Sequence, residues 1–549
     1  MKHAVAALLL SATLQFLCFL RWPGDPDWDV AHSVFAAQNF LAHRGLKSIN
    51  LFAAPTDDLA RQARIYWMTH WPPAHSLLYL GAMEFGLTPG PATKVLIFLC
   101  LVGGGLGWLL LARELNTPSS AILVIAVAWP WLAFMAHSWL DYKNDTLACA
   151  LAPWIYWAVI RIEPLRSPEE ERWLRLIGAA LLAGFAIWVK FSMSPIIAGS
   201  GLYLLLLDGT NFSRRRIARI AVFGTALAAP AILLWSLNHA WAGETSYPLL
   251  GGGLPFSLFV FGKNIISHTF GSAMGWELVV IESDAAAGHW LHHHFPHGVV
   301  FVVSLIAMVI WVIYLVRQQR DEKDSRFLRY LVLLTLSLLG TLAATTVLSK
   351  IHYDFSADGR FSFPISYGWL LLGVIALAKI SERSTLRSAA LITLTAPVVF
   401  SVLFFAASGL FTRPYLQMPH SRTIWFETPD PAHAAFFSTL TALKPDLIVT
   451  HTGRDLMEFE VPDFYTFEAT KDDANLYYSS KALRVIALVS SEQEATVLLR
   501  KFRQASTISR VQTPDGFPYL VFELDFAGPE DENGDHAATP VPMVPRPSD

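Results

Sequence analysis

The chain has 549 residues, of which 53% are hydrophobic and only 15% are charged, and its formal net charge is −3. The charged residues form short clusters between long apolar runs, which indicates a polytopic membrane protein rather than a soluble one. A net charge so near zero gives no reason to expect nucleic-acid binding. The three cysteines lie in apolar segments and lack the spacing of metal ligands, which argues against a disulfide framework or a cysteine zinc site.

The apolar segments predict about eleven membrane-spanning helices, so the expected fold is an all-α membrane bundle with additional juxtamembrane helices. The first segment, residues 4–20, has no small-residue cleavage site before Arg21, and we interpret it as an uncleaved span rather than a signal peptide. The other predicted spans are residues 92–112, 118–136, 146–160, 176–190, 192–207, 217–236, 298–316, 328–348, 362–378 and 388–410.

Lysine and arginine residues concentrate in alternate loops, which sets the predicted orientation. The positive-inside rule makes these loops cytoplasmic, together with the N-terminus, in an inner-membrane protein. The periplasmic loops are then residues 21–91, 137–145, the turn at Lys190, 237–297 and 349–361. The basic residues of the four cytoplasmic loops are Arg161, Arg166, Arg172 and Arg175; Arg214, Arg215, Arg216 and Arg219; Arg317, Arg320, Lys323, Arg326 and Arg329; and Lys379, Arg383 and Arg387.

Residues 74–87 look like a short span, but counting them as one would invert every basic loop downstream. We therefore predict an interfacial or re-entrant helix on the outer face. Residues 30–43 predict an amphipathic helix lying on the membrane, so that 21–91 becomes an outer helical loop. The apolar face of that helix would consist of Val30, Val34, Phe35, Ala37, Phe40 and Leu41.

The apolar runs stop after residue 411, where we place the end of the membrane domain. Residues 412–526 predict a small soluble α/β domain on the periplasmic side. Residues 527–549 are acidic and then proline-rich, which predicts a disordered tail. Within the soluble domain we expect strands at 446–450, 484–489 and 518–524 and helices at 431–443 and 491–504.

Asp29 opens the 30–43 helix and is the leading candidate for a catalytic base. At a helix N-cap, the free N–H groups and the helix dipole stabilise a carboxylate, which can then accept a proton from an attacking hydroxyl or amine. Asp25 and Asp27 lie beside it, and His70 and Trp71 are candidate substrate-pocket residues on the same outer side. The alternative is an ordinary helix cap with solvated loop acids.

Asp145 ends a short outer loop that also contains Tyr142, a candidate pocket residue, and it would cap the span that starts near residue 146. Because it faces the same side as Asp29, the two carboxylates could converge, one as base and one as orienter or metal ligand, unless Asp145 only caps its helix.

Lys190 lies between two apolar runs. A charge there is costly unless it snorkels to the interface or pairs with an anion such as a lipid phosphate.

Arg360 lies at the outer start of a late span, where it suits phosphate recognition or serves as an interfacial anchor. His352 and Tyr353 are close enough in sequence to shape the same pocket. A histidine run at residues 289–297 shows no closed ligand set, so we predict no metal site, and a divalent metal is not favoured.

Taken in order, these segments resemble the GT-C superfamily of membrane glycosyltransferases, and within it the branch of protein O-mannosyltransferases and lipid A aminoarabinose transferases. The resemblance covers about residues 1–380. The usual Asp-Glu pair is Asp29-Val30 here, so Asp25 or Asp27 would have to supply the second acid. The matching segments are Asp29, Ala37-Gln38-Asn39, Gly45, His70-Trp71-Pro72-Pro73 with the stretch to Leu87, Gly184 to Lys190, Trp241 to Pro248, and Gly359 to Pro364.

The resemblance implies transfer of a sugar from a polyprenyl-phosphate donor to a lipid, glycan or protein acceptor outside the membrane. It implies that Asp29 is the base, assisted by Asp145. Lys190 and Arg360 would hold the lipid phosphate and stabilise its charge as it leaves. No cofactor is required on this interpretation, because cations of the protein itself neutralise the leaving group.

Three other functions compete with this one. A transporter or flippase predicts internal pseudo-symmetry and ionisable groups near mid-span, whereas the sequence shows no repeat and its ionisable groups cluster at the outer ends of spans. A lipid-linked oligosaccharide polymerase or ligase of another fold would use similar outer loops, but the helical loop directly after the first span favours GT-C. A non-catalytic scaffold should tolerate Asp29→Asn.

Overall fold

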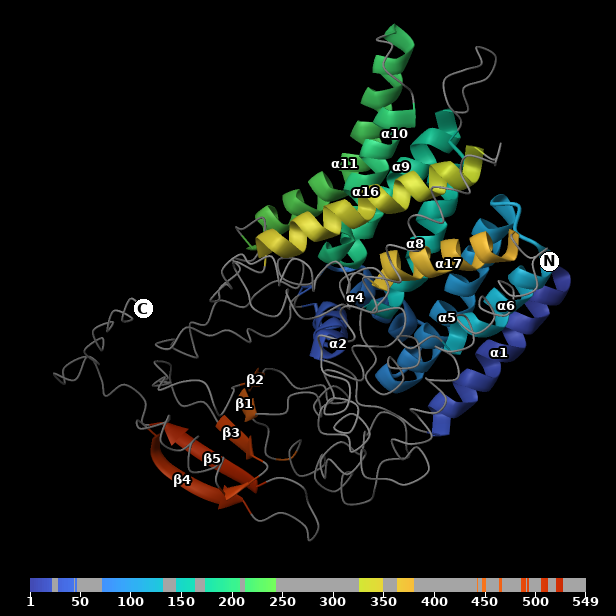
Figure 1. Ribbon diagram of the computed structural model, residues 1–549. Helices are drawn as coiled ribbons and strands as arrows, with labels where there is room; N and C mark the ends of the chain where they lie inside the picture. Colours follow the sequence, from blue (N-terminus) through green and yellow to red (C-terminus); the bar gives the residue numbers. More distant parts are fainter. Residues whose placement is uncertain are drawn as a thin grey trace. The chain divides into compact units, whose positions relative to one another are not determined.

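In the computed structural model, the described residues are 1–21, 28–43, 45–46, 72–131, 145–162, 173–207, 213–242, 325–348 and 363–379, five later strands, and residues 442, 491 and 492. The chain divides into two compact units, whose helices and strands are labelled in Figure 1. Unit 1 comprises Met1–Pro26, Met68–Leu78 and Thr93–Tyr415, and unit 2 comprises Asp27–Trp67, Tyr79–Ala92 and Leu416–Asp549.

Apolar helices make up the described part of unit 1, as the sequence predicts. Three of them are long and apolar enough to cross a membrane: α5 (Pro89–Glu114), α11 (Arg214–Ala242) and α16 (Ser325–Leu348). The predicted spans 298–316 and 388–410 lie outside the described residues. Shorter helices match the remaining predicted spans, namely α1 (Lys2–Arg21), α6 (Ser119–Ala128), α8 (Asp145–Ile160), α9 (Trp173–Val189), α10 (Ser194–Leu207) and α17 (Phe363–Lys379).

The segment predicted as one span over 118–136 is not a continuous helix. α6 ends at Ala128, and Trp129–Trp131 form a short 3₁₀ turn, η1. Pro130 has no backbone N–H to donate, which explains the break. α1 binds this break through side chains: Ser11 Oγ donates to the Val127 carbonyl at 2.8 Å, and Trp131 Nε1 donates to Ser11 Oγ at 2.9 Å.

Glycines allow the helices of unit 1 to approach one another closely. A Cβ at Gly199 of α10 would lie 2.5 Å from Ser337 Oγ of α16, and a Cβ at Gly104 of α5 would lie 2.9 Å from Ala150 Cα of α8. Small residues at such contacts are typical of membrane helix bundles, where close van der Waals packing replaces the hydrophobic drive of water. The core of unit 1 is therefore sensitive to added volume.

Tyrosine hydroxyls tie α8, α16 and α17 together inside unit 1. Tyr156 of α8 donates to the Pro364 carbonyl at 3.4 Å, and Tyr330 of α16 donates to the Gly368 carbonyl at 3.2 Å. The two tyrosine rings also pack edge to face, with their centroids 5.8 Å apart. Both side chains are fully buried, so the hydrogen bonds satisfy polar atoms that would otherwise destabilise the core.

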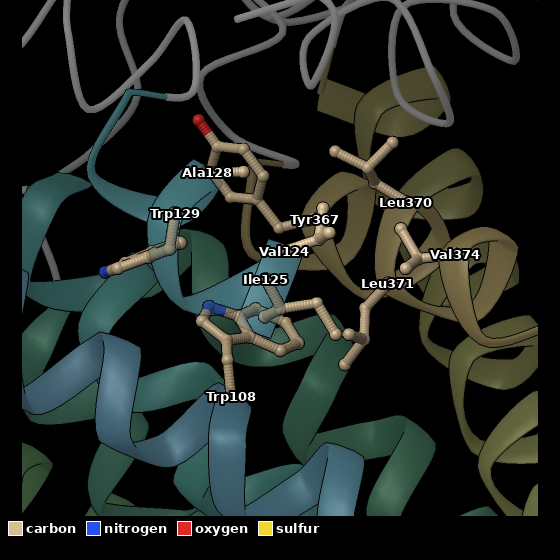
Figure 2. A pocket seen from close by; sticks show the side chains of 9 residues that line it. All are labelled: Trp108, Val124, Ile125, Ala128, Trp129, Tyr367, Leu370, Leu371 and Val374. Atoms are coloured by element: carbon tan, nitrogen blue, oxygen red, sulfur yellow. The ribbon is translucent and has the colours of Figure 1, made fainter. Parts of the chain in front are cut away.

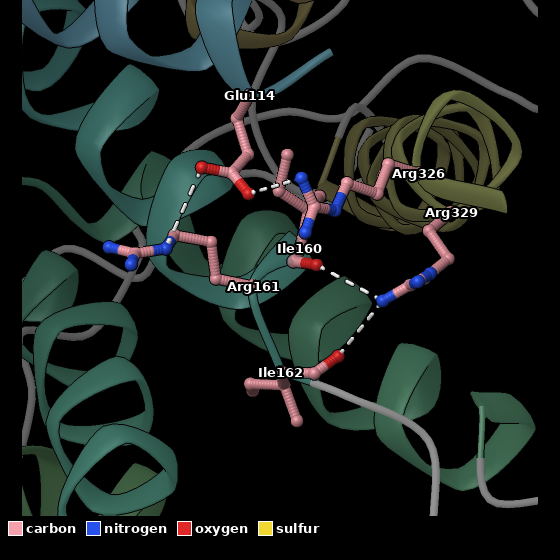
Figure 3. A network of polar contacts seen from close by, with 6 residues as sticks. All are labelled: Glu114, Ile160, Arg161, Ile162, Arg326 and Arg329. Carbon is pink, nitrogen blue, oxygen red and sulfur yellow. Dashed lines mark hydrogen bonds and ion pairs between the residues drawn. The ribbon is translucent and has the colours of Figure 1, made fainter. Parts of the chain in front are cut away.

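One end of unit 1 gathers arginines at helix termini (Figure 3). Glu114, the last residue of α5, pairs with Arg326 at 3.0 Å and with Arg161 at 3.7 Å. Arg329 donates to the carbonyls of Ile160 and Ile162 at 3.5 and 3.3 Å, at the C-terminus of α8. A cation stabilises this negative end of the helix dipole.

Unit 2 contains α2 (Trp28–Leu41), the helix predicted at 30–43. Val30, Val34, Phe35 and Ala37 of its predicted apolar face are buried, whereas Phe40 of the same face is 45% exposed. His32 and Ser33 are as fully buried as Val34, so the buried surface of α2 is wider than the predicted stripe. Left-handed backbone at His43 and Gly45, with φ of 59° and 83°, follows its end.

The helix predicted within 74–87 is α4 (Ala74–Glu84). Its 11 residues extend about 16 Å, roughly half the thickness of a bilayer core. This length agrees with the prediction that the segment is not a span.

A five-stranded mixed sheet forms the described part of the C-terminal region, in the order β2-β1-β3-β5-β4. β1 (Leu447–Thr450) pairs in parallel with β2 (Phe464–Thr466) and β3 (Val485–Val489), and β5 (Leu520–Phe526) runs antiparallel to β3 and to β4 (Ala505–Val511). The predicted strands at β1, β3 and β5 are confirmed to within two residues, while β2 and β4 were not predicted. The predicted helices fall almost wholly outside the described residues.

We predict that Gly184→Ala lowers the melting temperature of the detergent-purified protein, whereas Gly178→Ala does not. The new Cβ at Gly184 would overlap the Leu227 carbonyl of α11, and overpacking of this kind costs about 1–3 kcal/mol. Gly178 lies on the same helix with nothing within 4 Å of its Cβ position, so there alanine gains helix propensity. Equal melting temperatures for the two variants would contradict the observed α9–α11 packing.

Candidate active site

Asp145 begins α8 and is almost completely buried, with 2% of its side chain exposed. We predicted that it caps this helix. Instead it lies in the first turn, and its Oδ1 accepts a hydrogen bond from Lys190 Nζ. The positive end of the α8 dipole still stabilises the carboxylate at this position.

Lys190 lies in the break between α9 and α10. Its backbone N–H still donates to the Ala186 carbonyl at 3.1 Å, as in a helix. The backbone dihedral angles of Lys190 are nevertheless extended, with φ −160° and ψ 138°. The 3₁₀ turn η2 (Phe191–Met193) follows and leads into α10. A cation just beyond a helix C-terminus is stabilised by the negative end of the dipole, so α9 and α8 favour opposite charges at the point where they meet.

The two side chains form a buried ion pair with Nζ and Oδ1 2.5 Å apart, although 45 residues separate them in sequence. Lys190 is 12% exposed. A charge in an apolar bundle needs a partner, and the sequence left open whether Lys190 reaches the interface or pairs with an anion. The structure supplies an anion from the protein itself.

A second polar position adjoins the pair. Asp145 Oδ2 and Thr146 Oγ1 are both buried, and neither has a hydrogen-bond partner among the described residues. Buried polar atoms of this kind are usually satisfied by water or by a ligand. The site therefore offers a carboxylate oxygen and a hydroxyl to a hydrogen-bonding group.

The ion pair and the arginine-rich cluster of Figure 3 lie at opposite ends of α8. Asp145 begins the helix and Ile160 ends it, a rise of about 22 Å. The predicted topology puts the arginines in the cytoplasm and Asp145 with Lys190 outside. Their placement at opposite helix ends agrees with that assignment.

A small apolar pocket of about 40 Å³ lies between α5, α6, η1 and α17 (Figure 2). The indole rings of Trp108 and Trp129 and the ring of Tyr367 form its aromatic wall, and Val124, Leu371 and Val374 contribute aliphatic surface. Its lining carries no charged side chain, so it offers nothing to a phosphate.

Several predicted site residues lie outside the described part of the chain, namely Asp25, Asp27, His70, Trp71, Tyr142, His352, Tyr353 and Arg360. Asp29 is the second residue of α2, inside the first turn rather than at the N-cap. It belongs to unit 2 and Asp145 to unit 1, so their convergence stays a prediction.

Within the described ranges, no group of three or more His, Cys, Asp or Glu residues could hold a metal ion. The histidine run at 289–297 falls outside those ranges. Metal dependence therefore stays untested.

Sequence reasoning missed Glu114, the carboxylate around which Arg161 and Arg326 gather. The available signal was an acidic residue at the end of an apolar run, on the side where the predicted topology places the basic loops.

A double-mutant cycle should show strong coupling between Asp145 and Lys190. Lys190→Met alone leaves a buried carboxylate without its cation, a change that typically costs about 3–5 kcal/mol, and Asp145→Asn should restore part of the lost stability in the double variant. Thermal unfolding in detergent measures the effect. The matched control is the ion pair Arg510–Glu492, which is bonded at 2.8 Å but is 57% and 70% exposed, so its coupling should stay below about 1 kcal/mol. Additive effects at Asp145 and Lys190 would contradict a functional pairing between them.

Comparisons with known proteins give a structural likeness but no sequence match. No protein-family model and no curated protein matches the chain. Among solved structures, the chain is similar to ArnT from Cupriavidus metallidurans bound to undecaprenyl phosphate. The likeness covers 94% of this chain and 97% of that chain, with 12% sequence identity and a TM-score of 0.47. A likeness at this identity assigns no reaction to the chain.

Proposed function

We propose that this protein is an integral-membrane glycosyltransferase that moves a sugar from a polyprenyl-phosphate donor to an acceptor at the outer, periplasmic face of the inner membrane. The observation that carries the proposal is the buried Asp145–Lys190 pair at the end of the bundle away from the arginines. It holds a cation at a helix end, where a lipid phosphate at the membrane surface would meet it.

Lys190 is proposed to bind the donor phosphate. Asp145 fixes the position of this cation before substrate arrives, so little reorganisation is needed when negative charge develops on the leaving phosphate. Arg360 is proposed to add a second, bidentate contact.

Asp29 is proposed as the general base. The acceptor hydroxyl or amine attacks the anomeric carbon of the sugar while Asp29 takes its proton. The bond from that carbon to the phosphate oxygen breaks, and the polyprenyl phosphate leaves with the electron pair. Lys190 and Arg360 stabilise its charge, so the proposal requires no metal or other cofactor.

The position of Asp29 in the first turn of α2 supports this role, because the positive end of a helix dipole favours a negatively charged group. Asp25, Asp27, His70, Trp71, Tyr142, His352 and Tyr353 are proposed to line the acceptor and sugar pocket. The C-terminal sheet is proposed to belong to a periplasmic domain of residues 412–526.

Asp29→Asn should abolish sugar transfer, by about 100-fold or more, while the protein purifies as a folded monodisperse species. The measurement is incubation of purified protein with a panel of radiolabelled polyprenyl-phosphate sugars, with both transfer and hydrolysis counted. Glu84→Gln is the control, because Glu84 is an exposed carboxylate at the end of α4 and should be dispensable. If the wild-type protein releases sugar from no donor and neither variant differs from it, a transporter or a scaffold explains the chain better.

A further inference from the structure

The end of α9 is anchored to α11 just before the chain reaches Lys190. Trp188, two residues before Lys190, donates a hydrogen bond from its indole Nε1 to the Pro230 carbonyl of α11 at 2.7 Å. Trp188 is buried, and a buried indole N–H without an acceptor would destabilise the bundle. The hydrogen bond therefore favours one position for the last turn of α9.

Two further contacts hold the same part of α9. Gly184 lies directly against α11, because a Cβ at this position would overlap the Leu227 carbonyl and would lie 3.1 Å from the Pro230 ring. The helix backbones can approach closely only because this residue has no side chain. The Phe185 ring stacks on the Trp188 ring, with the ring centroids 5.9 Å apart and the planes inclined by 15°. The indole is thus held both through its N–H group and through one face.

Lys190 depends on such an anchor because the helix stops at this residue. Its backbone is extended and the 3₁₀ turn η2 follows, so the chain changes direction there. A lysine side chain is a flexible four-carbon stem, and the ion pair with Asp145 fixes its charged tip. The place of the ammonium group is therefore set by where α9 ends as well as by the carboxylate.

We propose that Trp188 is a positioning residue for Lys190: its hydrogen bond to the Pro230 carbonyl fixes the end of α9 so that the Lys190 ammonium meets both Asp145 and the donor phosphate. This role rests on the proposed function, in which Lys190 stabilises the charge of the leaving phosphate. Trp188 acts through Lys190 rather than on the substrate. Such a residue matters because a displacement of about 1 Å at a reacting site can lower turnover by about 100-fold.

A triple-mutant cycle tests the positioning without any sugar substrate. The coupling between Asp145→Asn and Lys190→Met is measured from melting temperatures of the full-length protein in detergent, with and without Trp188→Phe. This change removes the N–H donor and keeps an aromatic ring beside Phe185. The non-additive part of the melting-temperature shift should fall by about half or more, because the ammonium group then meets the carboxylate in a less defined geometry.

Phe223→Leu is the matched control for a general loss of stability. Phe223 of α11 belongs to a buried cluster with Leu176 and Ala179, which lie near the other end of α9. The change should lower the melting temperature but leave the coupling between Asp145 and Lys190 as it is in wild type. Unchanged coupling in Trp188→Phe, or an equal fall in Phe223→Leu, would mean that Trp188 only stabilises the bundle and would overturn the inference.

Turnover gives the second readout, with the donor that the radiolabelled panel identifies. Trp188→Phe should lower kcat roughly 10-fold with a smaller change in KM, since the displaced cation stabilises charge that develops in the transition state. Phe223→Leu should change neither value below its melting transition. Weaker coupling with an unchanged kcat would contradict the role of Trp188 in the reaction. If wild type transfers no sugar, the proposed function fails, and the coupling alone decides whether Trp188 positions Lys190.

Discussion

The Asp145–Lys190 ion pair ties the start of α8 to the end of α9, and the arrangement of unit 1 depends on that junction. A lysine follows α9 directly, between two apolar runs, and an unpaired charge there would destabilise the bundle. The pair resolves this by placing the carboxylate at the positive end of one helix dipole and the ammonium at the negative end of another. It joins these two helix ends.

The two ends of α8 lie in chemically different surroundings. Arginines at one end cap helix carbonyls and surround Glu114, with considerable exposure to the surroundings. At the other end Lys190 is buried against Asp145.

Sequence patterns predicted the helices well because long apolar runs have few alternatives in a membrane. They failed where contacts between residues far apart in the sequence determine which side chains are buried or paired. Asp145 and Lys190 were singled out separately, but nothing in a 45-residue separation shows that they are partners. The apolar stripe of α2 was predicted only in part, because polar residues such as His32 are buried too and Phe40 is exposed. β4 was missed because Ser506, Thr507 and Ser509 give an edge strand a weak apolar alternation.

The central claim is that Lys190 acts on a lipid phosphate and not only on Asp145. The charge-swapped variant, Asp145→Lys with Lys190→Asp, tests it directly, because it keeps an ion pair and moves the cation to the other helix. Its melting temperature and its sugar-transfer rate are measured beside those of Lys190→Met. The account predicts that the swap recovers only part of the stability that Lys190→Met loses, because both charges then face unfavourable helix dipole ends, and that it restores no transfer. Recovery of both stability and transfer would contradict it, because the pair would then be structural alone.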